Sequence, residues 1–256
     1  MRVPRNIAIA LLSLMLPVAA GAADGTPIDP VIAAAVEHPD RPAADRKRDA
    51  LRRPAEVLEF FGVRPGMSII EYFAAGGFTA EVLARVVGPG GKIYMQNPEW
   101  MYESGGSEAV AQRLANARLP NVVRLDKPID ALDLPDESVD GATLNLVFHD
   151  FFWLTEDVSL VLEDLYRTLE PGGFVGVVDH AAPAGTGSEY ARDRQGGQHR
   201  VDEALVRRMF LDAGFVLQKE GDFLRNPADD REMPFFAPEL RGKATDRFVL
   251  LFRKLP

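Results

Sequence analysis

The 256-residue sequence contains no cysteine, only four histidines and two tryptophans. The absence of cysteine excludes disulfides, thiolate metal sites and cysteine nucleophiles, so a folded state must be stabilised by a hydrophobic core. Basic residues are outnumbered by acidic ones, and the formal net charge is −9 at pH 7. Such acidity argues against nucleic acid or an anionic membrane as a partner.

The N-terminal segment has the three parts of a secretory signal peptide. Arg2 and Arg5 supply positive charge, residues 7–18 form an apolar run, and residues 20–22 are the small residues that precede a cleavage site. The run is short for a bilayer span, and an uncleaved anchor helix is the alternative. We therefore predict a cleaved signal peptide over residues 1–23. The mature protein is then periplasmic or secreted, with no membrane contact after cleavage.

A short helical arm is predicted over residues 24–53, ahead of a single domain over residues 54–256. Within the arm, residues 29–37 have a helical pattern, and residues 45–49 carry charges of both signs at helical spacing. Such charges indicate a solvated helix face supported by i,i+4 pairs, with a basic binding patch as the alternative. The remainder of the chain is long enough for one sizeable α/β domain.

The stretch from Met67 to Val87 predicts a strand, a glycine turn and a helix in succession. Residues 68–73 are mostly β-branched or aromatic, as in a central parallel strand covered on both faces. Gly76 and Gly77 interrupt this pattern, and the apolar residues that follow recur on one face of a helix. Such a turn directs free backbone N–H groups toward a ligand, which indicates a nucleotide-type site. The alternative is a tight turn that needs glycine only for its backbone angles.

Strands and helices alternate along the rest of the chain. Further strands are predicted at 92–96, 122–125, 141–148, 174–178, 215–219 and 247–252, and further helices at 55–61, 107–117, 156–169 and 202–213. Regular alternation with short turns implies an α/β fold with a mostly parallel sheet, whose ligands bind at the carboxyl ends of the strands.

Three segments stand at characteristic places in this pattern. Residues 71–77 combine an acidic residue with glycines after the first strand, residues 130–140 precede the fourth strand, and residues 169–173 form the turn into the fifth. Together they resemble the class I S-adenosylmethionine-dependent methyltransferase family over nearly the whole mature chain. In particular, the chain resembles a bacterial group of predicted methyltransferases with signal peptides. That similarity extends to Arg53-Pro54, Asp179-His180, His199-Arg200 and Asn226-Pro227-Ala228-Asp229-Asp230.

The resemblance implies a doubly wound, Rossmann-like, seven-stranded mixed sheet in strand order 3-2-1-4-5-7-6, with the last strand antiparallel. It also implies S-adenosylmethionine as cofactor and methyl donor, and an unknown small-molecule acceptor. Glu71 would shape the methionine side of the pocket, Asn97 stands where an acid normally binds the ribose hydroxyls, and Asp130 stands where a carboxylate accepts from the adenine amine. The expected cofactor-binding residues are Glu71, Phe73, Ala75, Gly76, Gly77, Asn97, Asp130, Ala131 and Asn145.

Three positions depart from the family pattern. Phe73 and Ala75 replace two alternating glycines, and Asn97 replaces the acid. Because an amide lacks the charge assistance of a carboxylate, donor affinity is expected to be weak and Asn97→Asp to tighten it. An exported binding protein or pseudoenzyme that keeps the fold with a changed ligand is the alternative function. An NAD-binding fold fits less well, since the later strand landmarks do not favour it.

Histidines and acids follow the fourth and fifth predicted strands, whose ends converge on the crevice of such a sheet. His149 and His180 are predicted to be catalytic and to act on the acceptor, because histidine is the base best matched to neutral pH. Their alternative role is to bond loop backbones. Residues predicted to bind substrate are Asp150, Asp179, Tyr190 and His199. A metal site made of His149, Asp150, Asp179 and His180 is not predicted, because their spacing matches no known ligand pattern.

Overall fold

The computed structural model describes residues 19–20, 27–192 and 197–256. Its strands are β1 (Ala19–Ala20), β2 (Ser68–Glu71), β3 (Lys92–Gln96), β4 (Val122–Leu125), β5 (Val139–Asn145), β6 (Leu169–His180), β7 (Val216–Gly221) and β8 (Arg247–Arg253). Its α-helices are α1 (Pro30–Val36), α2 (Ala43–Arg52), α3 (Pro54–Phe61), α4 (Phe78–Val87), α5 (Glu99–Met101), α6 (Ser107–Leu114), α7 (Phe151–Leu154), α8 (Val158–Thr168) and α9 (Glu203–Asp212). Short 3₁₀ or π turns are η1 (Tyr102–Gly106), η2 (Ala115–Ala117), η3 (Phe148–Asp150) and η4 (Pro238–Leu240).

All described strands belong to one sheet in the order β1-β7-β8-β6-β5-β2-β3-β4. β8 runs antiparallel to both β6 and β7, and the other pairs are parallel. If β1 is left out and β2 is counted as the first strand, the order read from β4 to β7 is the expected 3-2-1-4-5-7-6. The predicted mixed seven-stranded sheet is therefore confirmed. β1 adds two residues at the β7 edge, within the segment predicted to be a signal peptide. Apart from Ala19–Ala20, that predicted segment lies outside the described residues.

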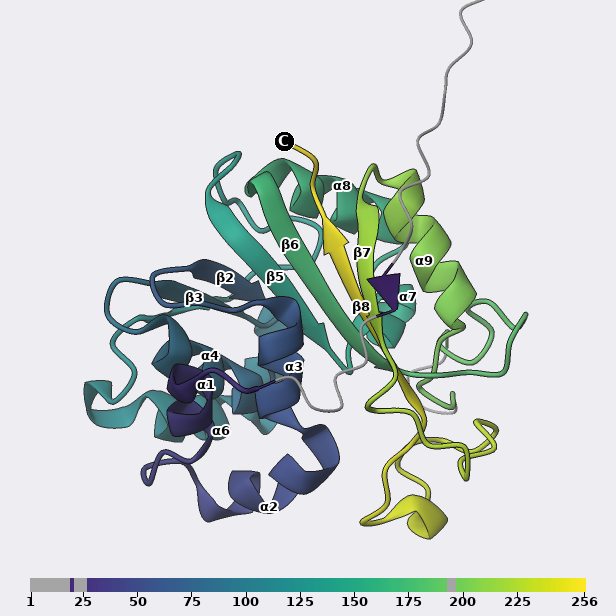
Figure 1. Cartoon of the computed structure of the whole chain (residues 1–256), viewed down its shortest axis with the longest axis horizontal. Coiled ribbons are helices and arrows are strands. Elements are labelled where there is room, and N and C mark those ends of the chain that lie inside the picture. The colour runs from purple at the N-terminus through teal and green to yellow at the C-terminus, as the bar shows by residue number, and fades with distance from the viewer. Residues whose placement is uncertain (1–18, 21–26, 193–196) are drawn as a thin grey trace, which may run out of the picture.

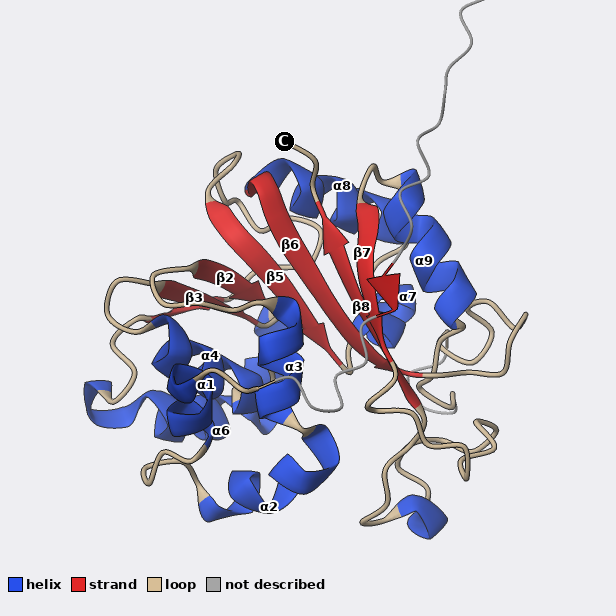
Figure 2. Ribbon diagram, viewed as in Figure 1, coloured by secondary structure: helices blue, strands red, loops and turns tan. Residues whose placement is uncertain are grey.

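Helices cover both faces of the sheet (Figure 2). On one face α1, α3 and α4 contribute to a core that includes Ile69 and Ile93, and on the other α8 and α9 pack over Ile70 and Leu144. Ile69 and Ile70 are consecutive in β2 and fully buried on opposite faces. This double coverage explains why the β2 sequence is apolar without alternation.

Two strands end earlier than predicted, and each early end shapes the region above the sheet. β2 stops at Glu71, and Phe73 then takes a left-handed φ of 45°. β5 stops at Asn145, and the chain turns at Leu146, whose φ is 62°. The predicted fourth strand therefore ends in a turn and the first residue of η3, which carries His149 and Asp150 at the carboxyl end of the sheet.

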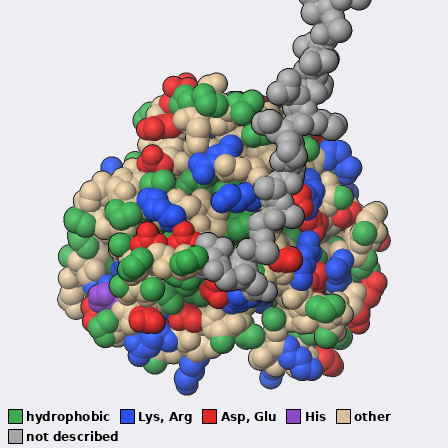
Figure 3. All heavy atoms as spheres, viewed as in Figure 1, with side chains coloured by type: hydrophobic (Ala, Val, Ile, Leu, Met, Phe, Trp, Pro, Cys, Tyr) green, Lys and Arg blue, Asp and Glu red, His purple; other side chains and the backbone are tan. Residues whose placement is uncertain are grey.

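α2 and the segment that joins β7 to β8 lie on the same side of the molecule, where the parallel strands end (Figure 1). Among the described residues, none of the helices combines the length and hydropathy that a membrane crossing requires. On the face seen in Figure 3, basic and acidic side chains are intermixed with hydrophobic ones.

Candidate functional site

The loop after β2 carries two non-glycine residues in the left-handed region. Phe73 has φ 45° and Ala75 has φ 49°, a conformation that costs an L-residue roughly 1–2 kcal/mol. Side chains at the end of β3 hold the loop in place. Gln96 Oε1 accepts from the Phe73 N–H at 2.8 Å, and Asn97 Oδ1 accepts from the Ala75 N–H at 2.8 Å.

The two glycines of the loop have different roles. Gly76 lines the cleft above the sheet, and a Cβ there would meet Ala109 Cβ at 3.4 Å, which is ordinary contact. Gly77 does not line that cleft; its φ is 80°, and an added Cβ would lie 3.0 Å from Met95 Cε. The ligand-facing interpretation therefore suits Gly76, whereas Gly77 is needed for its own backbone and packing.

The cleft has a volume of about 240 Å³ and extends from the β2 loop to the ends of β5 and β6. Its lining residues are Arg48, Arg52, Glu71, Phe73, Ala74, Ala75, Gly76, Phe78, Thr79, Arg113, Asn145, Leu146, Val147, Asp150, His180 and Phe235. Of these residues, Glu71, Phe73, Ala75, Gly76, Asn145, Asp150 and His180 were predicted from the sequence. The arginines and Phe235 were not predicted.

Glu71 is buried at the floor of the cleft. The Thr143 hydroxyl donates to its carboxylate, and Asn145 Nδ2 lies 3.3 Å from Oε2. Burial raises the pKa of Glu71 to about 7, although these hydrogen bonds and the charge of Arg52 act in the opposite direction. The carboxyl group therefore changes charge near neutral pH.

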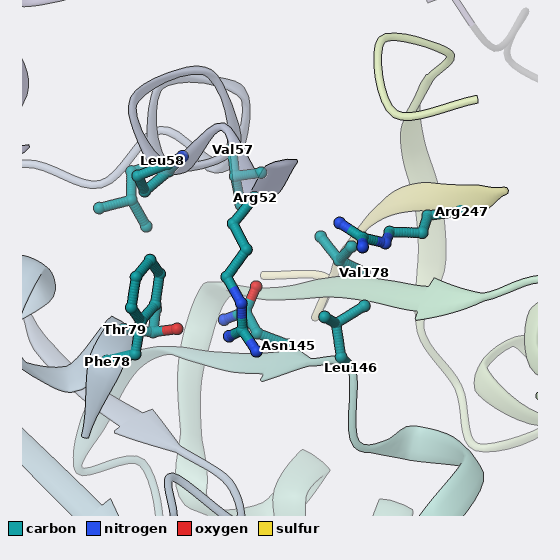
Figure 4. A pocket seen from close by; sticks show the side chains of 10 residues that line it. Arg52, Val57, Leu58, Phe78, Thr79, Asn145, Leu146, Val178 and Arg247 are labelled. Carbon is teal, nitrogen blue, oxygen red and sulfur yellow. The ribbon is translucent and has the colours of Figure 1, made fainter. Parts of the chain in front are cut away.

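Arg52 reaches from the end of α2 toward Asn145 and Leu146 (Figure 4). Burial lowers the pKa of its guanidinium to about 10, so it stays charged at neutral pH. The Arg48 and Arg52 guanidinium carbons lie 4.7 and 4.8 Å from the Phe78 ring centroid, within the range of a cation–π interaction. α2 thus covers the cleft with two cations.

The prediction of a solvated charged face holds for Arg46, Lys47 and Arg48 of α2, which are exposed, but not for Asp45. Asp45 is buried and pairs with Arg48 and with Arg113, each at 2.7 Å. Arg113 also donates from Nε to the Gly76 carbonyl at 2.8 Å. The i,i+4 spacing of Arg48 and Arg52 in the sequence is the signal that could have indicated a cationic stripe facing a ligand.

At the other end of the cleft, η3 brings His149 against Asp179 at the end of β6. His149 Nδ1 lies 2.7 Å from Asp179 Oδ1, and the His149 backbone N–H donates to Oδ2 at 2.8 Å. Its Nε2 lies 3.3 Å from Asp150 Oδ1, and His199 Nδ1 lies 3.3 Å from the same oxygen. Trp153 Nε1 donates to that oxygen at 2.9 Å. Predicted catalytic and substrate-binding residues therefore meet here.

The two histidines predicted to be catalytic have opposite electrostatic environments. Burial disfavours the charged form of His149, but the charge and hydrogen bond of Asp179 outweigh it and raise the pKa. Burial and the nearby charge of Arg247 lower the pKa of His180 well below its ordinary range. His180 is therefore neutral at pH 7. Its ring stacks on Phe235 with centroids 4.7 Å apart, and its Nδ1 lies 2.6 Å from Thr245 Oγ1.

A buried ion pair fixes the segment that supplies Phe235. Arg200 makes a bidentate pair with Asp229 at 2.9 and 3.0 Å and donates to the Met233 carbonyl at 2.7 Å. The backbone of Phe235 in turn donates to the Gln198 carbonyl at 3.2 Å. The His199-Arg200 and 226–230 motifs of the sequence thus form one structural unit beside the cleft.

Eight predicted site residues do not line the cleft: Gly77, His149, Asp179 and His199, which lie beside it, and four that lie farther away. Asn97 is fully buried behind the loop, Asp130 is exposed and accepts from Thr155 Oγ1 at 2.9 Å, and Ala131 is exposed. The Tyr190 hydroxyl donates to Glu232 at 2.5 Å. The cleft does not contain these side chains, because the loops that carry them bond to neighbouring segments instead.

A second pocket, of about 380 Å³, is lined mainly by residues that follow β3 and β4. This is the region where the family resemblance implies that adenine would bind. It is lined by Pro98, Glu99, Trp100, Glu103, Asp126, Pro128, Ile129 and Leu154. Phe73 lines the first cleft and Trp100 the second, and their ring centroids are 6.0 Å apart. Trp153 completes the group at 6.3 Å from Phe73 and 6.2 Å from Trp100.

A sheet in this strand order, with a glycine-containing turn after the central strand and polar groups after the next two, has the class I methyltransferase fold. Residues 104–177 match the family model described as methyltransferase domain. The resemblance seen in the sequence is thus confirmed at the level of the fold, and residues 104–177 are similar to a methyltransferase domain. The matched residues begin after the Glu71–Gly77 loop, which is the part that departs from the family pattern.

Several known proteins are similar to this chain in sequence or in fold. The ubiquinone/menaquinone biosynthesis C-methyltransferase UbiE of Saccharophagus degradans is 25% identical over 138 residues, which are 54% of this chain and 52% of that protein. The chain thus matches about half the length of this curated relative. A S-adenosylmethionine-dependent methyltransferase from Aquifex aeolicus has a TM-score of 0.60 at 20% identity, covering 86% of this chain and 97% of that one. The [4+2]-cyclase SpnF has a TM-score of 0.59 at 18% identity, covering 86% and 85%.

Proposed function

We propose that this protein transfers a methyl group from S-adenosylmethionine to a small-molecule nucleophile. The observation that carries the proposal is one continuous cleft, which joins the Glu71 and Gly76 end to the Asp150 and His180 end. A donor at the first end and an acceptor at the second would meet above the ends of β2 and β5. The family match and the fold support the same reaction.

The charges at the loop end suit the methionine part of the donor. Glu71 offers a carboxylate to an ammonium group, and Arg48 and Arg52 offer cations to a carboxylate. The cleft volume of about 240 Å³ is below the roughly 300–1,000 Å³ of complete small-molecule sites. The adenine part would therefore enter the second pocket, which requires the Phe73 and Trp100 rings to move apart.

The polar end of the cleft suits the acceptor. In methyl transfer the bond between sulfur and the methyl carbon breaks as the bond to the nucleophile forms, and an O–H or N–H nucleophile also loses a proton. Asp150 and His180 line this end, and His149 Nε2 lies against Asp150. Most of the rate enhancement would come from holding donor and acceptor in line.

Two matched glycine variants test donor binding in the cleft. Gly76→Leu adds a side chain at a cleft-lining position whose φ is not left-handed, whereas Gly90 does not line the cleft and an added Cβ there meets only Gly66 Cα, at 3.9 Å. Calorimetric titration with S-adenosylmethionine should give heat for the wild type and Gly90→Leu and none for Gly76→Leu. Labelled methyl transfer to a small-molecule extract then tests the reaction.

The alternative function is that of a binding protein or pseudoenzyme with a changed ligand. The conformation of the loop after β2 favours this alternative. Phe73 stands between the two pockets, and the Asn97 amide is bonded to Ala75. The cyclase SpnF shares the fold, and a fold hosts more than one chemistry. Donor binding without any methyl transfer would support a pseudoenzyme. No heat from the folded wild-type protein would mean that the cleft binds another ligand.

Export of the protein is also proposed, from the charge, apolar run and small residues at its N-terminus. Expression in a Gram-negative host followed by osmotic release should recover a shortened chain that begins near residue 23 or 24. Recovery of the full-length chain in the cytoplasm or membrane fraction would contradict cleavage.

A further inference from the structure

Three side chains at the acceptor end of the cleft converge as the ligands of one metal ion do. His149, Asp150 and His199 each offer an atom, and these atoms all lie within 4.8 Å of one another. Both imidazole nitrogens are 3.3 Å from Asp150 Oδ1. Ligand atoms about 2.1 Å from one ion are roughly 3.0–3.4 Å apart at octahedral or tetrahedral angles. The two nitrogen–oxygen distances already have this value.

The contacts of Asp179 place Nε2 of His149 against a second carboxylate, that of Asp150. Asp179 accepts the His149 backbone N–H at Oδ2, and its Oδ1 lies 2.7 Å from His149 Nδ1. In the neutral imidazole, an Nδ1–H bonded to Asp179 leaves Nε2 as an acceptor, directed at Asp150 Oδ1. Two acceptor atoms at this separation repel unless a cation or a proton lies between them. A carboxylate behind a metal-binding histidine is also the usual outer partner of such a ligand.

The surrounding charges allow a cation here. Asp150 and Asp179 bring two carboxylates to the group, the buried Arg200 pairs with Asp229, and the buried Arg247 interacts electrostatically with Asp179. Arg200 also fixes the backbone next to His199, which has a left-handed φ of 54°. The position of the third ligand is therefore set by the buried ion pair.

We propose that His149, Asp150 and His199 form a binding site for one divalent transition-metal ion, with Asp179 as the outer carboxylate that orients His149. Two imidazoles and one carboxylate suit Zn²⁺ and Fe²⁺ and leave coordination positions open. Because Asp150 lines the cleft, an open position can face the acceptor.

This site deepens the proposed function, and its role in catalysis rests on that function. An acceptor hydroxyl bound to the ion would lose its proton to solvent more readily, because a cation stabilises the oxyanion. The oxygen would then take the methyl group as the bond from sulfur to carbon breaks. Metal binding itself requires neither donor nor acceptor.

Zn²⁺ titration of the tag-free full chain, after dialysis against a chelator, tests the site by calorimetry. The wild type should bind one ion per chain. Asp150→Asn and His199→Asn should bind at least ten-fold more weakly, and Asp179→Asn roughly 10- to 100-fold more weakly. Asparagine is chosen at position 199 because it tolerates the left-handed backbone there. His38→Asn is the matched control, since His38 lies apart from the cleft on the arm, and it should bind as the wild type does.

Absence of saturable Zn²⁺ binding to the folded wild type would overturn the proposal and leave a proton between His149 and Asp150. Unchanged affinity in both Asp150→Asn and His199→Asn would also overturn it. If Asp150→Asn does not fold, as judged by circular dichroism, the partly exposed His199→Asn decides alone. Metal binding with no methyl transfer would contradict the proposed function and support the metal site. Donor binding and methyl transfer without Zn²⁺ binding would support the proposed function and contradict the metal site.

Discussion

The side-chain amide of Asn97 bonds both backbone groups of Ala75: Oδ1 accepts from the N–H at 2.8 Å, and Nδ2 donates to the carbonyl at 3.1 Å. Asn97 is fully buried, so its amide supports the loop rather than facing a ribose. An aspartate could accept the first bond but could not donate the second. The structure therefore reverses the expectation that a carboxylate at this position would improve donor binding.

Asn97→Asp should lower the free energy of unfolding by about 1–3 kcal/mol, because it leaves a buried carbonyl unsatisfied and places a charge against it. Donor affinity should fall or stay unchanged. Urea denaturation and calorimetry measure the two effects. Asn116→Asp is the control, since Asn116 is exposed. A stable Asn97→Asp protein with tighter donor binding would contradict this role for the amide.

Phe73→Gly should tighten binding of S-adenosylmethionine roughly five- to hundred-fold. The ring contacts Trp100 and Trp153, and each aromatic pair is worth about 0.5–1.5 kcal/mol, which the donor must overcome to span both pockets. Ala75→Gly is the matched control, because it relieves a similar left-handed φ of 49° without removing a ring. Equal tightening in both variants would assign the effect to backbone strain instead of the ring.

The fold was predictable because its signals are local and repeated. The β3 and β4 ranges agree with the predicted strands residue for residue, and so does the start of α4 at Phe78. The loop after β2 was harder, since nothing in the sequence says that Phe73 and Ala75 take positive φ or that Asn97 turns inward. Local periodicity does not report such long-range side-chain contacts.

The candidate site was predictable at the strand ends and not in the segments that cover them. His149 and Asp150 follow β5, and Asp179 and His180 are the last residues of β6; the ends of these strands converge in any sheet of this type. Arg52 and Phe235 come from the arm and from the β7–β8 connection. Their approach to the cleft depends on tertiary packing, which a charge pattern or a Phe-Phe pair does not encode by itself.

His149→Ala and His180→Ala should lower turnover while S-adenosylmethionine affinity stays within a few-fold of the wild type. His180 lines the end of the cleft assigned to the acceptor, and His149 lies against Asp150 and Phe235, which also line it. Lost transition-state interactions appear in kcat. Steady-state kinetics and calorimetry separate the two quantities. Loss of donor affinity equal to the loss of kcat would show that these residues contact the donor.

Asp229→Asn should destabilise the protein by about 3–5 kcal/mol, because it leaves the fully buried Arg200 charge without its partner. The segment that carries Phe235 should then loosen, and its amides should exchange hydrogen faster. Asp126→Asn is the control, since its pair with Arg124 is largely exposed, and such pairs contribute about 0–1 kcal/mol. Similar destabilisation by both variants would contradict a special role for the buried pair.

Glu71 should make the protein less stable as the pH rises through neutrality. Its pKa is about 7 in the folded protein, against an ordinary value of 4.5, so between these values the folded state holds a proton that the unfolded state has released. Stability attributable to Glu71 is therefore complete below pH 4.5 and is lost as the pH rises through 7, by about 3 kcal/mol in total.

Glu71→Gln isolates this effect, because the amide can still accept from Thr143 but has no charge to desolvate. The difference in unfolding free energy between Glu71→Gln and the wild type should increase in favour of the variant from pH 5 to pH 8, while other titrating groups cancel. Denaturation at several pH values measures it. A constant difference across this range would mean that Glu71 is ionised throughout, and that Arg52 compensates its burial in full.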